Sequence, residues 1–350
     1  MRRTVLTLLV VCLGLFVGAG GAQAAGPFGS WLELTGNATS GAAGHGYVEI
    51  PHHASLNPTT GFTFEAWIRI DASFPTCRSI AGKGWTEAWW VGVCGNTLRS
   101  YLRGSTSRYD AGTIPLGTWT HIAVVGDGTS VKHYIDGVLA GTRAEPSGPT
   151  TSTLPMRIGS DAQYFYSPDG AIDEVRLWSV ARTAAQINAA RNSPITTAQP
   201  GLVAVWALDG NGEDVVGSRD GSLFGSFSFD TKPAPPAGPW LSSASIPGFQ
   251  FKVRITSGSN VFAGVGESDC IAETVCASGA LAGRSEVFLR VIGPRPNGYL
   301  WPTIVRFTVS QVEVWIEQLG TGQINYYKLD AVPADSDELN GLVDRTGFLP

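Results

Sequence analysis

Residues 61–70, with the sequence GFTFEAWIRI, form the stretch that decides the fold, because apolar and polar side chains alternate along it. Successive side chains of a β-strand point to opposite faces of a sheet, so this alternation predicts a strand. One face would carry Phe62, Phe64, Ala66, Ile68 and Ile70, and the other Thr63, Glu65, Trp67 and Arg69. We therefore expect a sheet here that turns its apolar face to a hydrophobic core.

Further short strands follow, separated by turn signals. Residues 120–141 (THIAVVGDGTSVKHYIDGVLAG) predict three strands, joined by a Gly-Asp-Gly turn and an Asp136-Gly137 hairpin turn. Residues 170–178 and 201–210 predict two more strands, and residues 181–192 predict one helix with Thr183 as its N-cap. Many short strands with one small helix indicate an all-β antiparallel sandwich over residues 29–230.

A second β-rich block follows a Pro-rich linker at residues 231–239 (TKPAPPAGP). The segment QVEVWIEQL alternates as a half-buried strand would, setting Val312, Val314 and Ile316 against Glu313, Trp315 and Glu317. The length of 350 residues also suits two domains. We predict a smaller β-rich domain of unknown role at residues 240–350.

The composition excludes several classes of protein. Only 15% of the residues are charged, against about 25% in a typical soluble protein, and the formal net charge is −5. With 43% hydrophobic residues the chain is too apolar for a disordered protein. Because it has no basic excess, it offers no track for nucleic-acid phosphates and no attraction to an anionic membrane surface. We therefore expect no nucleic-acid partner.

The N-terminus has the pattern of a secretory signal peptide at residues 1–24. Arg2 and Arg3 form a charged start, and residues 5–17 (VLTLLVVCLGLFV) form an apolar stretch too short to span a bilayer comfortably. Residues 22–24 (AQA) then supply a small-x-small cleavage site. A membrane anchor is the alternative. We expect an exported, soluble mature protein, located outside the cell or at its surface, with no membrane insertion.

Four cysteines follow residue 24, and an even number in an exported chain indicates disulfides. The pairs Cys77–Cys94 and Cys270–Cys276 are favoured, because they lie in different halves of the chain. Residues 77–83 and 87–94 look like two strands of a hairpin, and this hairpin would set Cys77 opposite Cys94 within disulfide reach. A metal site is disfavoured because no CxxC occurs.

Residues 29–230 resemble the laminin-G-like jelly roll of the concanavalin A-like lectin/glucanase superfamily. The segments that carry the resemblance are GYVEIPHHASLNPTTGFTFEAWIRI, GTWTHIAVV, KHYIDGVLAGT, MRIGS, GAIDEVRLWSVARTAAQI and PGLVAVWALDGNGEDVVG, in the family's order. The resemblance implies two curved antiparallel sheets packed face to face, with loops at the rims. It also implies a module that binds glycans or proteins or mediates adhesion, often with calcium, although some relatives hydrolyse glycans. Residues 269–307 and 311–327 are similar to an uncharacterised part of bacterial exported proteins.

Asp173 is the candidate metal ligand. On a strand it would share a face with Ala171, Val175 and Leu177 and point toward the core, where a carboxylate needs strong partners. Calcium is one such partner, with backbone carbonyls in the other positions. The resemblance supports it, because an aspartate at the matching place can ligate a structural calcium in the superfamily. The alternative is a carboxylate capped by backbone N–H groups.

Four charged residues are expected on the opposite face of the sheet: Glu65, Arg69, Glu174 and Arg176. If their strands are neighbours, opposite charges pair across them and contribute about 0.2–1 kcal/mol each. The alternative is a catalytic carboxylate pair, which glycoside hydrolysis needs about 5–10 Å apart. The hydrolase branch of the superfamily places its carboxylates on one strand as E-x-D-x-x-E or E-x-D-x-E, and neither string occurs. We therefore favour the ladder of charges and predict no catalytic residues.

Aromatic side chains in loops are the candidate ligand contacts. A sugar ring stacks its apolar face on an aromatic ring, while neighbouring polar groups form hydrogen bonds with its hydroxyls. Trp85 lies near a turn and Tyr164 and Tyr166 lie in a loop, so these rings could stand at a rim of the sandwich. Of the consecutive Trp89 and Trp90, one should face the core. The alternative is that the loop aromatics pack down on the sandwich.

Arg103 and Arg108 could supply hydrogen-bond donors at the same rim. No nucleophile elbow, zinc-protease, P-loop or dinucleotide motif occurs in the sequence. The sequence therefore predicts a secreted, non-catalytic module that recognises an extracellular carbohydrate or a surface protein, with calcium as an optional aid. The alternatives are a carbohydrate-active hydrolase with an unrecognised acid pair, and a purely structural or adhesion protein.

Overall fold

The structure is a computed structural model of the chain. It describes residues 23–24, 28–36, 45–145, 148–163, 166–231, 235, 240–242 and 248–257, and then the segments 260–263, 265–271, 274–278, 287–292, 301–306, 311–319, 323–329 and 341–343. The predicted signal peptide lies outside these residues except for β1 (Gln23–Ala24), which pairs with a C-terminal strand. Of the predicted linker, only Thr231 and Pro235 are described.

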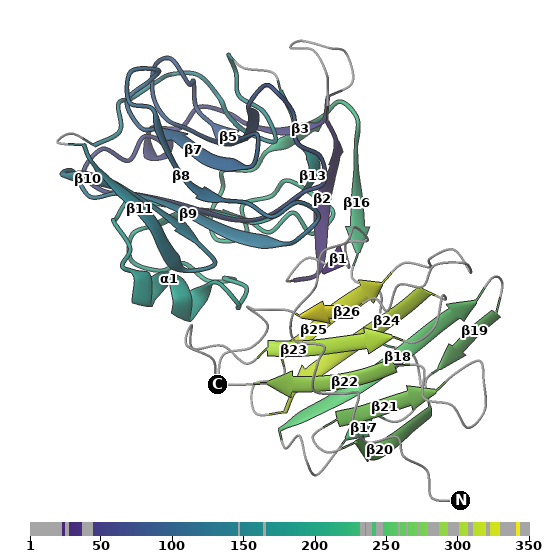
Figure 1. The fold of residues 1–350 in the computed structure, drawn as a ribbon. Coiled ribbons are helices and arrows are strands. Elements are labelled where there is room, and N and C mark those ends of the chain that lie inside the picture. The colour runs from purple at the N-terminus through teal and green to yellow at the C-terminus, as the bar shows by residue number, and fades with distance from the viewer. Residues whose placement is uncertain are drawn as a thin grey trace, which may run out of the picture.

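One antiparallel sheet of the N-terminal part has eight strands (Figure 1). They are β2 (Ser30–Thr35), β4 (Phe62–Ile70), β9 (Thr120–Gly126), β10 (Ser130–Ile135), β11 (Val138–Ala144), β13 (Asp169–Trp178), β14 (Leu202–Trp206) and β16 (Phe227–Thr231). Their order is β11-β10-β9-β4-β13-β2-β16, with β14 also paired to β13. The turn between β10 and β11 has positive φ at both Asp136 (50°) and Gly137 (76°), which confirms the predicted hairpin turn.

The second antiparallel sheet of the N-terminal part has seven strands. They are β3 (Tyr47–Ile50), β5 (Arg78–Gly82), β6 (Trp90–Cys94), β7 (Thr97–Tyr101), β8 (Tyr109–Thr113), β12 (Met156–Ile158) and β15 (Ser222–Phe224). Their order is β15-β3-β12-β5-β6-β7-β8, and the short 3-10 helix η1 (Ala54–Leu56) follows β3. The β5–β6 hairpin sets Cys77 beside Cys94, and the predicted disulfide between them is present.

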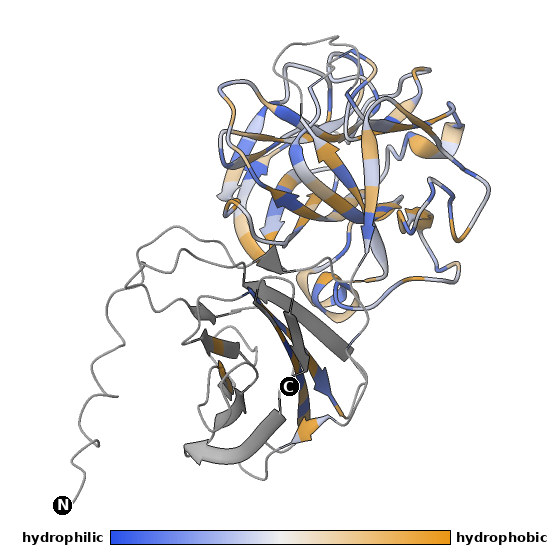
Figure 2. Cartoon of the chain, turned by 90° about the vertical axis from the view of Figure 1, so that its right-hand side faces the viewer, coloured by the Kyte–Doolittle hydropathy of each residue, from blue (hydrophilic) through white to orange (hydrophobic). Residues whose placement is uncertain are grey.

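These two sheets pack face to face around one hydrophobic core, and together we call them the N-terminal sandwich. The predicted apolar face of β4 lies wholly in this core, as Phe62, Phe64, Ala66, Ile68 and Ile70. Figure 2 shows apolar and polar residues alternating along the strands. The opposite face of β4 is buried too, because the chain after β13 folds back over it. The prediction of an all-β antiparallel jelly-roll sandwich is therefore confirmed.

The predicted helix is present as α1 (Ala184–Ala190), shorter at both ends than predicted. Thr183 is its N-cap, and the side chains of Thr183 and Gln186 form a reciprocal capping box. Ile187 packs on Ala123, Val125 and Tyr134, so α1 covers the outer face of the eight-stranded sheet (Figure 1). No helix in the described part of the chain is long and apolar enough to cross a membrane.

The described strands after residue 240 form two further sheets, as predicted for a second β-rich block. One contains β17 (Leu241–Ser242), β18 (Phe249–Ser257), β19 (Asn260–Ala263), β24 (Gln311–Gln318) and β25 (Gln323–Leu329), and β1 pairs with β25. The other contains β20 (Val265–Ile271), β21 (Thr274–Ser278), β22 (Val287–Ile292), β23 (Trp301–Arg306) and β26 (Gly341–Val343). Val312, Val314 and Ile316 lie in a core with Phe251 and Leu289, as their alternation predicts. Glu313 and Trp315 on the opposite face are buried too, so the strand is not half-buried as predicted.

The predicted boundaries at residues 230 and 240 stay a prediction. Cys270 and Cys276 lie on the paired strands β20 and β21, where Cys276 stands opposite Glu267. Their side chains are outside the described part of the structure, so their disulfide also stays a prediction.

Candidate functional site

The outward face of the seven-stranded sheet carries an aromatic cluster where β6 and β7 pair. Trp90 of β6 stands opposite Tyr101 of β7. The neighbouring Val91 and Leu98 lie in the core, so Trp90 and Tyr101 point outward. Trp89 lies in the core instead, which confirms that one of the two consecutive tryptophans faces inward.

Trp90 is the buried ring of this cluster. Its indole N–H donates to Ser79 Oγ at 2.8 Å, and its ring centroid lies 5.6 Å from that of Tyr101. A Cβ at Gly92 would stand 2.3 Å from the Trp90 ring, and one at Gly82 would stand 2.8 Å from it. The two glycines therefore make room for the indole, which is only 2% exposed.

Trp85 lies beside Tyr101 in the loop between β5 and β6. The two rings meet edge-on, with centroids 6.0 Å apart and an interplanar angle of 62°. The carboxylate of Asp161 holds this loop in place. It accepts hydrogen bonds from the backbone N–H groups of Gly84 at 2.8 Å, Trp85 at 3.3 Å and Gln163 at 2.9 Å. Burial raises the pKa of Asp161, and the three N–H groups oppose this rise. Asp161 thus ties the Trp85 loop to the loop that follows β12.

Arg103 follows β7 in a third loop. Ser107 Oγ accepts the Arg103 N–H at 2.7 Å, which closes this loop on itself. The Gly104 N–H donates to the Ala88 carbonyl at 2.7 Å. A Cβ at Gly104 would lie 2.2 Å from the Thr86 carbonyl oxygen, so only glycine allows the loop to approach this closely. The Arg103 loop therefore packs directly on the Trp85 loop.

We define the rim patch as the half-buried side chains of Trp85, Tyr101 and Arg103. The structure brings the loops of Trp85 and Arg103, both predicted ligand contacts, to one place. Tyr101 is not among the residues predicted from the sequence. Its signal was the alternation of β7, in which Leu98 and Leu102 enter the core and Tyr101 between them does not.

Tyr166 is not part of the rim patch. Its carbonyl accepts the Ser79 N–H near the start of β5, whereas Trp85 follows the end of that strand. The Arg78 guanidinium lies 5.2 Å from the Tyr166 ring centroid and 3.6 Å from that of Phe74. Tyr166 thus lies beside Arg78 and is half-buried, and its role as a ligand contact stays a prediction. Tyr164 lies outside the described residues, so its role stays a prediction.

A second aromatic row stands at the far edge of the same sheet. The rings of Phe224 on β15 and Tyr47 on β3 stack with centroids 5.3 Å apart. Arg157 of β12 places its guanidinium 4.4 Å from the Tyr47 ring and pairs with Glu49 at 2.7 Å. Phe224 is 42% exposed. Strands β12, β5 and β6 separate this row from β7, so it is distinct from the rim patch.

Asp173 lies at a β-bulge, and this corrects its predicted face. The pairing of β13 with β4 shifts after Asp173, where Glu174 has a φ of 49°. An extra residue in a strand exchanges the faces that follow it. Ala171 consequently lies in the outward tryptophan cluster, whereas Val175 and Leu177 lie in the core. The four residues do not share one face, although Asp173 is 0% exposed.

The surroundings of Asp173 fit a cation by charge. Its Oδ1 accepts the Glu174 N–H at 2.9 Å, and its Oδ2 has no hydrogen-bond partner within the described structure. Burial raises the pKa of Asp173 well above its ordinary range, and the carboxylates of Glu174 and Asp209 raise it further. The backbone N–H groups of Glu174 and Phe28 oppose this rise, as the alternative of a carboxylate capped by the backbone requires. Among the described residues, no three His, Cys, Asp or Glu side chains are grouped to hold a metal. Backbone carbonyls would therefore have to complete a calcium shell.

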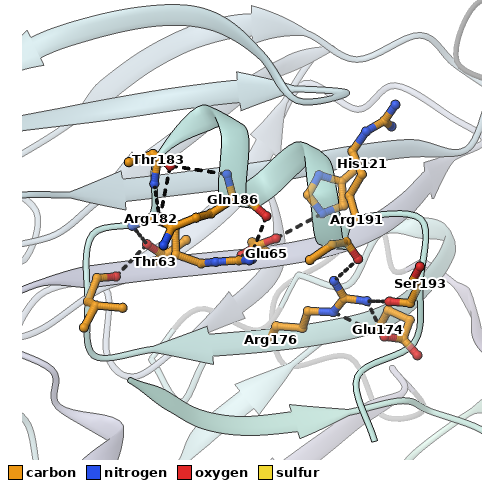
Figure 3. Close-up of polar contacts among 12 residues, drawn as sticks. Thr63, Glu65, His121, Glu174, Arg176, Arg182, Thr183, Gln186, Arg191 and Ser193 are labelled. Atoms are coloured by element: carbon orange, nitrogen blue, oxygen red, sulfur yellow. Dashed lines mark hydrogen bonds and ion pairs between the residues drawn. The ribbon is translucent and has the colours of Figure 1, made fainter. Parts of the chain in front are cut away.

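The charged residues beneath α1 form a buried network instead of the predicted cross-strand ladder (Figure 3). Arg176 stands opposite Glu65 in the register, as a ladder requires. Glu65 nevertheless pairs with Arg182, which the segment before α1 brings over the sheet. The bulge places Glu174 beside Arg176, and these two pair at 2.7 Å. Arg69 pairs separately with Glu33 at 2.5 Å and Asp71 at 2.9 Å.

Both glutamates that could form a catalytic pair are enclosed in this network. Glu65 is 0% exposed and Glu174 is 2% exposed. Burial raises the pKa of Glu65, but His121 at 3.5 Å and the arginines outweigh it and hold the pKa below its ordinary value. Arg176 also donates to the carbonyls of Ala190 and Ser193, which fixes the chain over the sheet. The network thus holds α1 in place.

Part of the chain matches a known family. Residues 42–188 match the model described as the concanavalin A-like lectin/glucanases superfamily, so the resemblance is confirmed for this segment. A search of the curated proteins found no match.

Solved structures provide further comparisons. The chain is similar to a Bacteroides ovatus protein for which carbohydrate binding has been proposed, with 20% identity, a TM-score of 0.47, and coverage of 60% of this chain and 62% of that chain. It therefore spans less than two thirds of that protein. It is also similar to domain 4 of AbnA, an extracellular arabinanase from Geobacillus stearothermophilus solved with arabinotriose. There the identity is 22%, the TM-score is 0.35, and coverage is 49% of this chain and 87% of that chain.

Proposed function

We propose that this protein is an exported, non-catalytic module that binds an extracellular carbohydrate through the rim patch. The observation that carries the proposal is the pair of half-buried rings, Trp85 and Tyr101, on the outward face of the sheet. A sugar ring can lay its apolar C–H face on such a ring while its hydroxyls accept hydrogen bonds from a guanidinium. Arg103, whose loop packs on the Trp85 loop, would supply that guanidinium.

The loops that carry the rim patch support the proposal because they are fixed by hydrogen bonds. Asp161 holds the Trp85 loop, and Ser107 together with Gly104 holds the Arg103 loop. A binding surface that is ordered in advance loses little conformational entropy when the ligand binds. Weak contacts with a few hydroxyls and one apolar sugar face can then suffice for measurable affinity.

The non-catalytic part of the proposal rests on the acidic residues. Glu65 and Glu174, which the sequence offers as an acid pair, are buried and paired with Arg182 and Arg176. A glycosidase needs one carboxylate to reach the glycosidic oxygen and the other to reach the anomeric carbon or a water. Neither glutamate has that access beneath α1. Export rests on the predicted signal peptide.

Calcium at Asp173 is a further part of the proposal. The ion would neutralise a carboxylate whose Oδ2 lacks a hydrogen-bond partner, so it should stabilise the folded protein. We expect the melting temperature to be higher in millimolar calcium than in chelator, and the difference to vanish in Asp173→Asn. Equal melting temperatures in calcium and chelator would instead support a carboxylate capped only by backbone N–H groups.

A glycan array with the whole protein tests the proposed function, and each positive glycan is then assayed for release of reducing sugar. Specific binding without turnover is the expected result. Release of reducing sugar would overturn the non-catalytic assignment in favour of a hydrolase. Binding to no glycan would favour a structural or adhesion role, or recognition of a surface protein.

A further inference from the structure

The β7–β8 hairpin concentrates positive charge in a chain whose formal net charge is −5. Residues 97–113 contain three arginines, Arg99, Arg103 and Arg108, and one acidic residue, Asp110. The hairpin also contributes Tyr101 to the rim patch. The excess charge therefore lies at the place where we propose that a saccharide binds.

Asp110 is shared by two of these arginines. Arg99 donates from Nε to Oδ1 at 2.5 Å and from Nη2 to Oδ2 at 2.9 Å, and Arg108 donates from Nη2 to Oδ2 at 2.6 Å. Burial raises the pKa of Asp110, but these hydrogen bonds outweigh it and hold the pKa below its ordinary value. One carboxylate neutralises one guanidinium, so a positive charge remains. The Arg108 side chain is 57% exposed and can present that charge to a ligand.

Arg103 adds a second positive charge. Within the described structure its side chain makes no hydrogen bond or ion pair. Arg99, Tyr101 and Arg103 occupy every second position along β7 and its continuation, so they point to the same face about 7 Å apart. Arg99 and Arg103 thus occupy the alternate positions before and after Tyr101 along the chain.

The backbone of Arg108 also lies close to that of Arg103. It follows Ser107, whose Oγ lies 2.7 Å from the Arg103 backbone nitrogen. The loop thus brings the backbone of Arg108 close to that of Arg103, while the Arg108 guanidinium turns to Asp110. Arg99, which shares Asp110 with Arg108, is also held in place, because its Nη1 donates to Cys77 Sγ at 3.2 Å.

We propose that the ligand of the rim patch is an acidic saccharide, whose carboxylate or sulfate is bound by Arg103 and Arg108. This inference rests on the proposed carbohydrate binding. The parallel N–H groups of a guanidinium match two oxygens of either anion, and such charge-assisted pairs are strong. A sugar ring on Trp85 and Tyr101 would place its anionic substituent beside the arginines. A neutral saccharide would leave the net positive charge of the hairpin uncompensated.

Calorimetry with the whole protein tests the proposal with two matched pairs of probes. Oligogalacturonate is compared with its carboxyl-reduced form, and a heparin oligosaccharide with its desulfated form, so the two arms separate carboxylate from sulfate. We expect at least one anionic probe to bind about tenfold more tightly than its neutral counterpart. Arg103→Gln should remove most of this preference. Arg103→Lys keeps the positive charge but loses the paired N–H groups of the guanidinium, so it should retain part of the preference.

The outcomes separate this inference from the proposed function. Equal binding of both members of each pair, still lost in Trp85→Ala, would overturn the acidic ligand and leave carbohydrate binding intact. Binding of no probe would count against both. Arg103 and Arg108 are exposed enough that Arg103→Gln and Arg108→Gln should fold, which a thermal melt checks. A preference for the anionic probe that both substitutions leave unchanged would overturn the assignment to these arginines.

Discussion

His133 makes the stability of the N-terminal sandwich depend on pH. It is 0% exposed, with Nε2 at 2.8 Å from Ser100 Oγ and Nδ1 at 3.0 Å from the Ala111 carbonyl. A neutral ring satisfies both contacts, because Nδ1–H donates to the carbonyl and Nε2 accepts the hydroxyl proton. Burial lowers the pKa of His133 to about 4, and that of the equally buried His121 to about 4.

Unfolding returns each histidine to its ordinary pKa of about 6.5. The unfolded chain then binds protons that the folded chain does not, so stability is lost as the pH falls from about 6.5 toward 4. For a pKa that shifts from 6.5 to about 4, the loss between pH 7 and pH 5 is about 2 kcal/mol per histidine. His121 and His133 together should lower the free energy of unfolding by about 4 kcal/mol.

Denaturant titration followed by tryptophan fluorescence measures this loss at pH 7 and pH 5. In His133→Gln the loss should be about 2 kcal/mol smaller than in the unmodified protein. Comparing two pH values within each protein removes the cost of the substitution itself. Equal losses in both proteins, or an NMR titration in which His133 takes up its proton near pH 6.5, would refute the reasoning.

Three further variants should be less stable in the N-terminal sandwich. Thr183→Ala should lower the free energy of unfolding by about 1 kcal/mol, because it removes the cap of α1, and a thermal melt that is unchanged would contradict this. Arg182→Met should lower it by about 3–5 kcal/mol, since Glu65 is left buried without its partner. Denaturant titration should show part of this loss recovered when Glu65→Gln is added. The double change Cys77→Ser and Cys94→Ser should lower it by about 3 kcal/mol for a sequence separation of 17. A protein as stable as its disulfide-bonded form would argue against this contribution.

Local sequence patterns predicted the elements whose contacts are local. The alternation of residues 61–70 placed five side chains in the core, because a strand in register repeats every two residues. The Asp136-Gly137 turn and the Cys77–Cys94 hairpin were predicted for the same reason, since a tight turn fixes the register of both strands.

Features that depend on a bulge or on distant segments could not be predicted in this way. The bulge at Asp173 and Glu174 has no sequence signal in a run of nine buried residues, so the faces before and after it were misassigned. The partner of Glu65 is Arg182, 117 residues away, which only the path of the chain over the sheet brings there. Tyr101 gains its importance from Trp85 and Trp90, which meet it only in the folded protein.

The central claim is that a saccharide binds at the rim patch, and calorimetry of two matched variants tests it most directly. Trp85→Ala and Phe224→Ala each remove one partly exposed aromatic ring from the same outward sheet face, but Phe224 lies on β15 at the opposite edge from the β7–β8 hairpin. With the best glycan from the array, we predict that Trp85→Ala weakens binding by about tenfold or more, while Phe224→Ala changes it by less than about twofold. Unchanged affinity in Trp85→Ala, or a loss confined to Phe224→Ala, would contradict the rim patch as the binding site.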